Sequence, residues 1–375
     1  MLPDLLADFT SKFIIKSNHM ARDYLVVGMM SGTSLDGIDL ILSRFHKRPD
    51  RWHFTIEKAL TIDYSGDWKK RLELAAGLDA ETFIMLHQEY GRFIGASISR
   101  FLSEQGLSAD LIASHGHTIF HQPGKGLTYQ LGEGASIASQ CKLTTVSDFR
   151  TLDVALGGQG APLVPVGDAL LFPQYRYCLN LGGFANISCN RDGRRIAWDI
   201  CPVNIVLNTL SRRSGQDYDL GGKAGRQGLP NDDLISELNN LGFYSVTGPK
   251  SLGREWVETT YMPVLEKYDI PLEDLMRSVY EHTAIQIGKC MNSPGAGEAL
   301  VTGGGAFNTF LMERISDRAR VRLVIPDDRL VKFKEALIFA FLGLLRFRNE
   351  INCLASVTGA RKDSSSGIIH LMFDA

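Results

Sequence analysis

The turn at residues 31–37 carries residue types that bind phosphate. Its sequence, Ser-Gly-Thr-Ser-Leu-Asp-Gly, lies between an apolar stretch, Tyr24–Met30, and an alternating stretch, Ile38–Phe45. Hydroxyls and backbone N–H groups of such a turn can converge on phosphate oxygens, and glycine permits close approach. The turn lacks the Gly-Lys-Ser/Thr ending of a Walker A loop, and a strand follows where a dinucleotide-binding turn has a helix. Phosphate binding and a plain tight hairpin are both compatible with this pattern.

Asp36 lies near the end of this turn. Its carboxylate could hold a hydrated Mg²⁺ beside bound phosphates. The alternative is that Asp36 closes the turn through a local hydrogen bond, as aspartate commonly does in turns.

Two further glycine turns follow apolar stretches that read as strands. Gly182 and Gly183 separate 177–181 from the next strand, which predicts a second hairpin like the first. Residues 303–305 follow the strand 298–302 and precede a helical stretch. Two similar hairpins far apart in the chain indicate two related halves, and helical patterns between them indicate α/β layers.

Asp199 is the carboxylate best placed to act as a base. It lies between Trp198 and Ile200 at the end of an apolar strand, where partial desolvation would raise its basicity. The alternative is that Asp199 caps the helix predicted to run from Pro202 through Leu210.

Three histidines, His115, His117 and His121, have a spacing that would suit zinc. No carboxylate or cysteine lies close to them in the sequence, which makes metal the weaker interpretation. We expect residues 114–118 to form a loop after the strand 111–113, with imidazole groups that contact a ligand or make structural hydrogen bonds.

Composition excludes several classes of function. The 375 residues include 42 acidic and 40 basic side chains, so no unbalanced charge is available for nucleic acid or an anionic membrane. The longest apolar run, Ala336–Leu345, is about half of the ~20 residues that cross a bilayer and reads as a buried helix. The six cysteines form no C-x-x-C pair, and the N-terminus is not built like a secretory signal, so we expect free thiols in the cytoplasm.

Several motifs follow one another along the chain: Gly28–Asp39 (GMMSGTSLDGID), Ser114–Thr118 (SHGHT), Asp148–Arg150 with Asp153, Gly157–Pro165 (GGQGAPLVP), Asn180–Asn186 (NLGGFAN) and Thr302–Asn308 (TGGGAFN). In sequence and in order they closely resemble the motifs of the anhydro-N-acetylmuramic acid kinases. The resemblance runs from about Tyr24 to the C-terminus. It implies an α/β, two-lobed, actin/hexokinase-like (ribonuclease H-like) fold with ATP in the cleft between the lobes.

The resemblance also implies an activity and its residues. Such an enzyme opens the 1,6-anhydro ring of the muramic sugar with water and phosphorylates O6, giving N-acetylmuramic acid 6-phosphate for cell-wall recycling. Asp199 is the implied catalytic base, Asp36 holds Mg²⁺ through water, and the sugar contacts His115, Arg150, Asn204 and Glu335. The implied ATP-binding residues are Ser31, Gly32, Thr33, Ser34, Leu35, Asp36, Gly37, Ile38, Gly182, Gly183, Gly303, Gly304 and Gly305.

Arg150 and Glu335 also have a chemical rationale. Arginine can form a bidentate ion pair with the lactyl carboxylate of a muramic acid, and glutamate accepts hydrogen bonds from hydroxyl or amide groups. The alternative for each is a solvated or ion-paired surface charge.

The chain departs from the family pattern at two positions. The motif around the base, Asp-x-Gly-Pro-Gly-Asn in the family, reads Asp199-Ile-Cys-Pro-Val-Asn204 here, with Cys201 and Val203 in place of glycines. Glycine often marks positive φ or close ligand approach, so the local backbone or the choice of sugar could differ. The alternatives are therefore an inactive sugar-sensing protein of the same fold, a kinase for a different anhydro or amino sugar, or a metal-dependent hydrolase that uses the three histidines.

The Gly- and Pro-rich segment 155–165 lies near mid-chain and reads as a linker or a substrate loop. We expect a small sugar as the substrate and a homodimer as a candidate assembly. The predicted organisation is an N-terminal extension (1–19), an N-terminal lobe (20–150) and a C-terminal lobe (151–375).

Overall fold

The first lobe is built on a seven-stranded mixed sheet in the order β12-β6-β4-β1-β2-β3, with β5 paired to β4. The computed structural model describes residues 22–32, 35–246, 250–292 and 297–373, so the predicted extension at 1–19 lies outside the described residues. β1 and β2 form the antiparallel hairpin predicted around residues 31–37. The strands are β1 (Tyr24–Ser31), β2 (Gly37–Lys47), β3 (Trp52–Asp63), β4 (Leu111–Gln122), β5 (Leu127–Leu131), β6 (Thr145–Ser147) and β12 (Ile368–His370).

Side-chain alternation along β2 decides which helix covers which face of this sheet. Ile38 and Leu40 are buried with residues of α3 (Ala80–Ser103), whereas Ile41 is buried with residues of α15 (Asp328–Phe347). α15 contains the predicted buried apolar helix, and no helix among the described residues is long and apolar enough to span a membrane. The other helices around this sheet are α2 (Gly66–Leu74), α4 (Gly134–Cys141), α5 (Thr151–Ala155), α6 (Val164–Leu171) and α16 (Ala355–Thr358).

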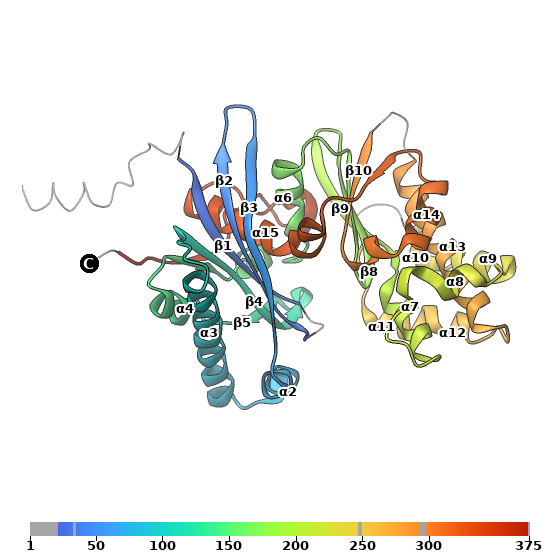
Figure 1. Ribbon diagram of the computed structural model, residues 1–375, viewed down its shortest axis with the longest axis horizontal. Coiled ribbons are helices and arrows are strands. Elements are labelled where there is room, and N and C mark those ends of the chain that lie inside the picture. Colours follow the sequence, from blue (N-terminus) through green and yellow to red (C-terminus); the bar gives the residue numbers. More distant parts are fainter. Residues whose placement is uncertain (1–21, 33–34, 247–249, 293–296, 374–375) are drawn as a thin grey trace, which may run out of the picture.

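The second lobe is built on a five-stranded sheet in the order β11-β10-β7-β8-β9, which stands beside the first sheet in Figure 1. The strands are β7 (Tyr177–Leu181), β8 (Phe184–Arg191), β9 (Arg194–Pro202), β10 (Glu298–Thr302) and β11 (Arg322–Val324). Its helices are α7 (Asn204–Arg212), α8 (Lys223–Gln227), α9 (Asp232–Asn239), α10 (Gly242–Ser245), α11 (Arg254–Trp256), α12 (Met262–Leu265), α13 (Leu272–Met291) and α14 (Thr309–Arg318). The predicted two-lobed α/β fold is thereby confirmed.

The predicted boundary at residue 150 is wrong for the last part of the chain. β12 pairs with β6 in the first sheet, and α15 packs on β1, β2 and β4. In Figure 1 the C-terminal end of the chain accordingly lies on the side of the first lobe. These segments return to the first lobe because α15 is apolar along most of its length and packs on a face of the sheet that would otherwise be exposed.

Buried charges join the two lobes. Lys334 on α15 lies 2.7 Å from Oδ1 of Asp168 on α6, and both side chains are almost completely buried. Asp168 Oδ2 accepts a 2.5 Å hydrogen bond from Ser188 on β8, whose hydroxyl accepts one of 2.7 Å from Arg195 on β9. This network ties the helix that covers the first sheet to strands of the second.

Gly28 tests how closely α15 packs on the first sheet. A Cβ at this position would lie 2.2 Å from the carbonyl oxygen of Ala336 and 2.8 Å from Cβ of Ala340. We expect Gly28→Ala to lower the free energy of unfolding by about 1–3 kcal/mol or more, because the helix must shift. Gly66→Ala, where a Cβ meets nothing within 4 Å, is the control and should not destabilise. Equal midpoints of thermal unfolding for the two variants would contradict this packing.

Candidate active site

Ser31 ends β1 and faces inward. Its buried hydroxyl lies 2.7 Å from the hydroxyl of Tyr64 and 2.9 Å from Nδ1 of His117. Tyr64 in turn is hydrogen-bonded to Tyr90 on α3 at 2.5 Å. The Ser31 side chain is therefore engaged in holding the start of the turn, and only its backbone is left for a ligand.

The other described residues of the turn are at least partly accessible. Gly32 and Asp36 are exposed, and Leu35 has the positive φ of 57° that lets the chain reverse direction. Gly37 is required by packing, since a Cβ there would lie 2.3 Å from the carbonyl oxygen of Ile62. The side chain of Ile38 is buried in the core, so it could contribute to ATP binding only through its backbone. The two remaining predicted residues, Thr33 and Ser34, lie outside the described residues.

The second hairpin supports the start of α7. The carbonyl of Gly183 accepts hydrogen bonds from the backbone N–H of Val203 (2.8 Å) and Ile205 (3.2 Å), and that of Gly182 accepts one from Asn204 (3.3 Å). The carbonyls of this turn therefore face the helix. The N–H groups at the helix start are already satisfied by them.

The third glycine turn borders a pocket. Gly303 has a φ of 84°, and a Cβ there would lie 2.7 Å from Oδ1 of Asn180. A Cβ at Gly305 would meet Cβ of Leu181 at 2.7 Å, whereas one at Gly304 would meet nothing within 4 Å. The pocket is lined by Asn204, Leu207, Asn208, Tyr218, Asp219, Leu220, Gly221, Tyr280, Gly304, Phe307 and Asn308.

Asp219 and Asn308 fix one wall of this pocket. Both bind the hydroxyl of Tyr280, which donates to Asp219 Oδ2 at 3.0 Å and accepts from Asn308 Nδ2 at 2.7 Å. Asn204, predicted at the sugar, lines this pocket together with Gly304.

Asp199 does not cap α7. The N-cap residue is Val203, and no side chain caps this helix. The backbone N–H of Asp199 donates to the carbonyl of Lys250 at 2.9 Å, and its Oδ2 accepts from the N–H of Leu252 at 2.8 Å. Burial raises the pKa of Asp199 above its ordinary value, and the Leu252 hydrogen bond lowers it by less. The capping alternative is therefore wrong, and the carboxylate has the desolvated environment expected of a base.

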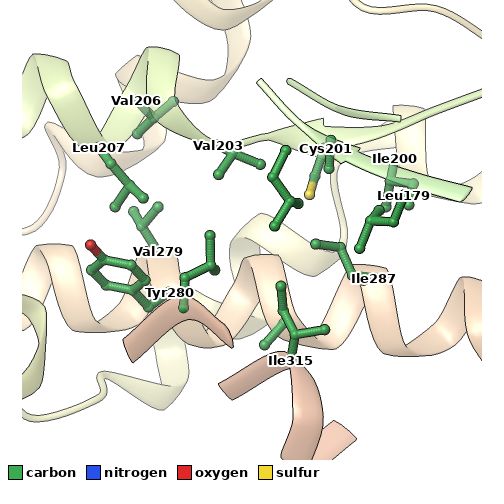
Figure 2. Packing of buried hydrophobic residues seen from close by; sticks show 14 of the residues in the cluster. Leu179, Ile200, Cys201, Val203, Val206, Leu207, Val279, Tyr280, Ile287 and Ile315 are labelled. Carbon is green, nitrogen blue, oxygen red and sulfur yellow. The ribbon is translucent and has the colours of Figure 1, made fainter. Parts of the chain in front are cut away.

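Cys201 and Val203 point away from the site. Figure 2 shows both side chains directed into the core of the second lobe, towards the residues of α13. Both are fully buried. A β-bulge lies where Cys201 pairs with Ala185, and the φ of Val203 is −132°, so neither position requires glycine for a positive φ. The side chains at the two departures from the family motif therefore fill the core of the second lobe.

Residues 114–118 form part of β4, so the predicted loop is wrong. The strand continues because residues 117–122 pair with β5. Nε of Arg150 donates to Nε2 of buried His115 at 2.9 Å, and its Nη1 donates to the carbonyl of Gly160 at 2.6 Å. With His117 bound to Ser31, these histidines make structural hydrogen bonds, and the described part of the chain holds no cluster suited to a metal ion.

Glu335 lies on α15 in the first lobe, where its side chain is exposed. Burial raises the pKa of Glu335, Arg150 lowers it and Asp39 raises it, so the three charges are neighbours. Asp39 was not predicted as a site residue, although it is an acidic residue within the largely apolar stretch that begins β2.

The sequence pattern of the anhydro-N-acetylmuramic acid kinase family matches residues 24–372. The chain belongs to this family. It is 34% identical to an anhydro-N-acetylmuramic acid kinase of Vibrio cholerae over 94% of this chain and 99% of that protein. It is 35% identical to one of Rhodococcus erythropolis over 91% of this chain and 93% of that protein. A Picosynechococcus relative of the same name is 34% identical over 92% of this chain and 99% of its own length.

The predicted site residues of this anhydro-N-acetylmuramic acid kinase family member fall into two groups. His115, Arg150 and Glu335 lie together in the first lobe, and Asp39 joins them. Asn204 and Gly304 line the pocket of the second lobe, and Asp199 lies on β9 of the same lobe. Sequence reasoning also missed Lys334, which precedes Glu335 and pairs with Asp168; no local pattern predicts such a long-range pair.

Buried His117 gives a stability test of this site. Burial lowers the pKa of His117 from 6.5 to about 4. The unfolded chain therefore binds the proton first, and the stability due to neutral His117 is complete above pH 6.5 and is lost as pH falls towards the folded pKa. We expect His117→Gln to make the dependence of the unfolding free energy on pH shallower by about 1.4 kcal/mol per pH unit in this window. Denaturant titrations at several pH values measure it, and a slope equal to the parent's would contradict a buried neutral imidazole.

Proposed function

We propose that the protein uses ATP to convert 1,6-anhydro-N-acetylmuramic acid into N-acetylmuramic acid 6-phosphate in the cytoplasm, as part of peptidoglycan recycling. The observation that carries the proposal is the desolvated Asp199 carboxylate at the position of the family's base motif, in a chain matched by that family over residues 24–372. The core-facing side chains of Cys201 and Val203 support the family's own sugar over a different one, because both are buried in the core of the second lobe.

Asp199 takes the proton of the attacking water. The water oxygen bonds to C1 of the sugar, the C1–O6 bond breaks, and O6 bonds to the γ-phosphorus of ATP as ADP leaves. A raised pKa makes Asp199 a stronger base than an exposed aspartate. In the described part of the chain, the Asp199 carboxylate accepts one hydrogen bond, from the N–H of Leu252 to Oδ2. Oδ1 is therefore available to the water.

The first-lobe group binds the sugar. Nε and Nη1 of Arg150 are held by His115 and by the carbonyl of Gly160, which orients the guanidinium and leaves Nη2 for the lactyl carboxylate. Glu335 accepts hydrogen bonds from hydroxyl or amide groups of the sugar.

ATP binds between the two lobes. Its phosphates lie on the backbone of the turns at residues 31–37 and 182–183, and its adenosine occupies the pocket of Gly304. The acidic residues at the first turn suit Mg²⁺, because exposed Asp36 lies close to Asp39: burial raises the pKa of the Asp39 carboxyl most, and the charge of Asp36 raises it further. Asp36 would hold the ion through water, and the ion would neutralise charge on the phosphates.

Asp199→Asn tests the proposed base, because it retains the shape and removes the basicity. We expect kcat with ATP and 1,6-anhydro-N-acetylmuramic acid to fall about 10²–10⁴-fold, with both ligands still bound. Steady-state turnover and calorimetric titration measure the two effects. Asp192→Asn, an exposed change in the β8–β9 turn, is the control and should be unaffected. Near-parental turnover by Asp199→Asn would disprove the assignment.

Gly304→Leu tests the adenosine pocket. The new side chain would project into space that is open in the protein, so we expect ATP affinity to fall at least tenfold with little change in sugar affinity or thermal stability. Calorimetric titrations with each ligand separate the two effects. Equal losses for both ligands would mean that the pocket is not specific to the nucleotide.

A further inference from the structure

Lys250 anchors the chain segment that touches Asp199. Its Nζ donates hydrogen bonds to the carbonyls of Phe243 (2.8 Å) and Val246 (3.0 Å) at the end of α10. The same Nζ lies 4.2 Å from the ring centroid of Phe243 and 5.9 Å from that of Tyr244. A cation that binds carbonyls at a helix end and the face of an aromatic ring is held by several favourable interactions at once.

The backbone that follows this ammonium group holds Asp199 at two points. The carbonyl of Lys250 accepts the N–H of Asp199, and the N–H of Leu252 donates to Oδ2. β9 is the edge strand of its sheet, so this segment takes the place of a neighbouring strand beside Asp199. A displacement of Lys250 would therefore move both hydrogen bonds of the carboxylate residue.

We propose that Lys250 is a positioning residue that fixes the orientation of the Asp199 carboxylate through the backbone at 250–252. The inference rests on the proposed role of Asp199 as the base. The lysine does not contact the substrate; its ammonium group secures the segment to α10, and the segment directs Oδ2 to Leu252 so that Oδ1 faces the water.

Among the described residues, few titratable groups lie around Asp199. Cys201 on β9 interacts with it, and Cys290 on α13 and Tyr244 on α10 interact with Cys201; burial raises the pKa of all three, which keeps them neutral. The Lys250 ammonium group interacts with Cys201 and Cys290. The Leu252 N–H is therefore the main group that favours the ionised carboxylate, against the effect of burial. Loss of this hydrogen bond would raise the pKa of Asp199.

Lys250→Met removes the ammonium group and keeps the apolar stem. We expect kcat to fall about 10–100-fold through misplacement of the base, with KM for ATP unchanged. The acid limb of the pH profile of kcat should move to higher pH, because the base must be ionised and its pKa has risen. Lys250→Arg keeps the charge and should recover most of the rate. Lys267→Met, an exposed lysine ion-paired with Glu237 in the same lobe, is the matched control and should behave like the parent.

A purely structural role for Lys250 would lower the melting temperature and leave the acid limb in place, and that result would overturn the proposal, as would parental kcat in folded Lys250→Met. If this variant does not fold, Phe243→Leu weakens the same anchor and must shift the acid limb in the same direction. Asp199→Asn is assayed alongside. Parental activity in Asp199→Asn refutes the base itself, whereas an inactive Asp199→Asn with a parental Lys250→Met refutes only the positioning role.

Discussion

The buried ion pair between Lys334 and Asp168 is the constraint on which the arrangement of the two lobes depends. Charges removed from water are energetically costly unless they are paired and hydrogen-bonded. Here Asp168 pairs with Lys334 and accepts a hydrogen bond from Ser188, whose hydroxyl accepts one from Arg195. Removal of one partner from such a pair typically costs about 3–5 kcal/mol, because the other charge stays buried. The pair sets the position of α15 relative to the second sheet. Since Glu335 is the next residue on α15, the same constraint sets where a sugar-binding carboxylate can lie.

The glycine turns differ in why they contain glycine. Gly37 and Gly305 are needed because a Cβ would collide with neighbouring strands, and Gly303 also has a positive φ. Gly304 has no such requirement and opens on a pocket. Of the three consecutive glycines, two are therefore required by packing, and the middle one leaves room for a ligand. Cys201 and Val203 illustrate the converse, since a side chain is accommodated where the family motif has glycine.

Much of the fold could be predicted from local patterns. The alternation after residue 37 predicted the first hairpin, and the apolar run Ala336–Leu345 predicted the buried part of α15, because such patterns are visible in short windows. The desolvation of Asp199 was likewise visible in its apolar neighbours. Three features could not be predicted, because each depends on a partner distant in the chain. They are the return of β12 to the first sheet, the extension of β4 through His117 and the pairing of Lys334 with Asp168. Lys250 carries no local signal either, because its role arises from backbone hydrogen bonds to another strand.

The first lobe needs the last part of the chain, and this has a consequence during synthesis. Until α15 has been made, the face of β1 and β2 that includes Ile41 and Phe45 has no cover, and β6 lacks its outer partner until residues 368–370 emerge. An uncovered apolar face and an unpaired strand edge are the features that drive association between incomplete chains. The second lobe, whose sheet is complete at β11, can close earlier. We therefore expect the second lobe to close before the first, in the reverse of their order in the sequence.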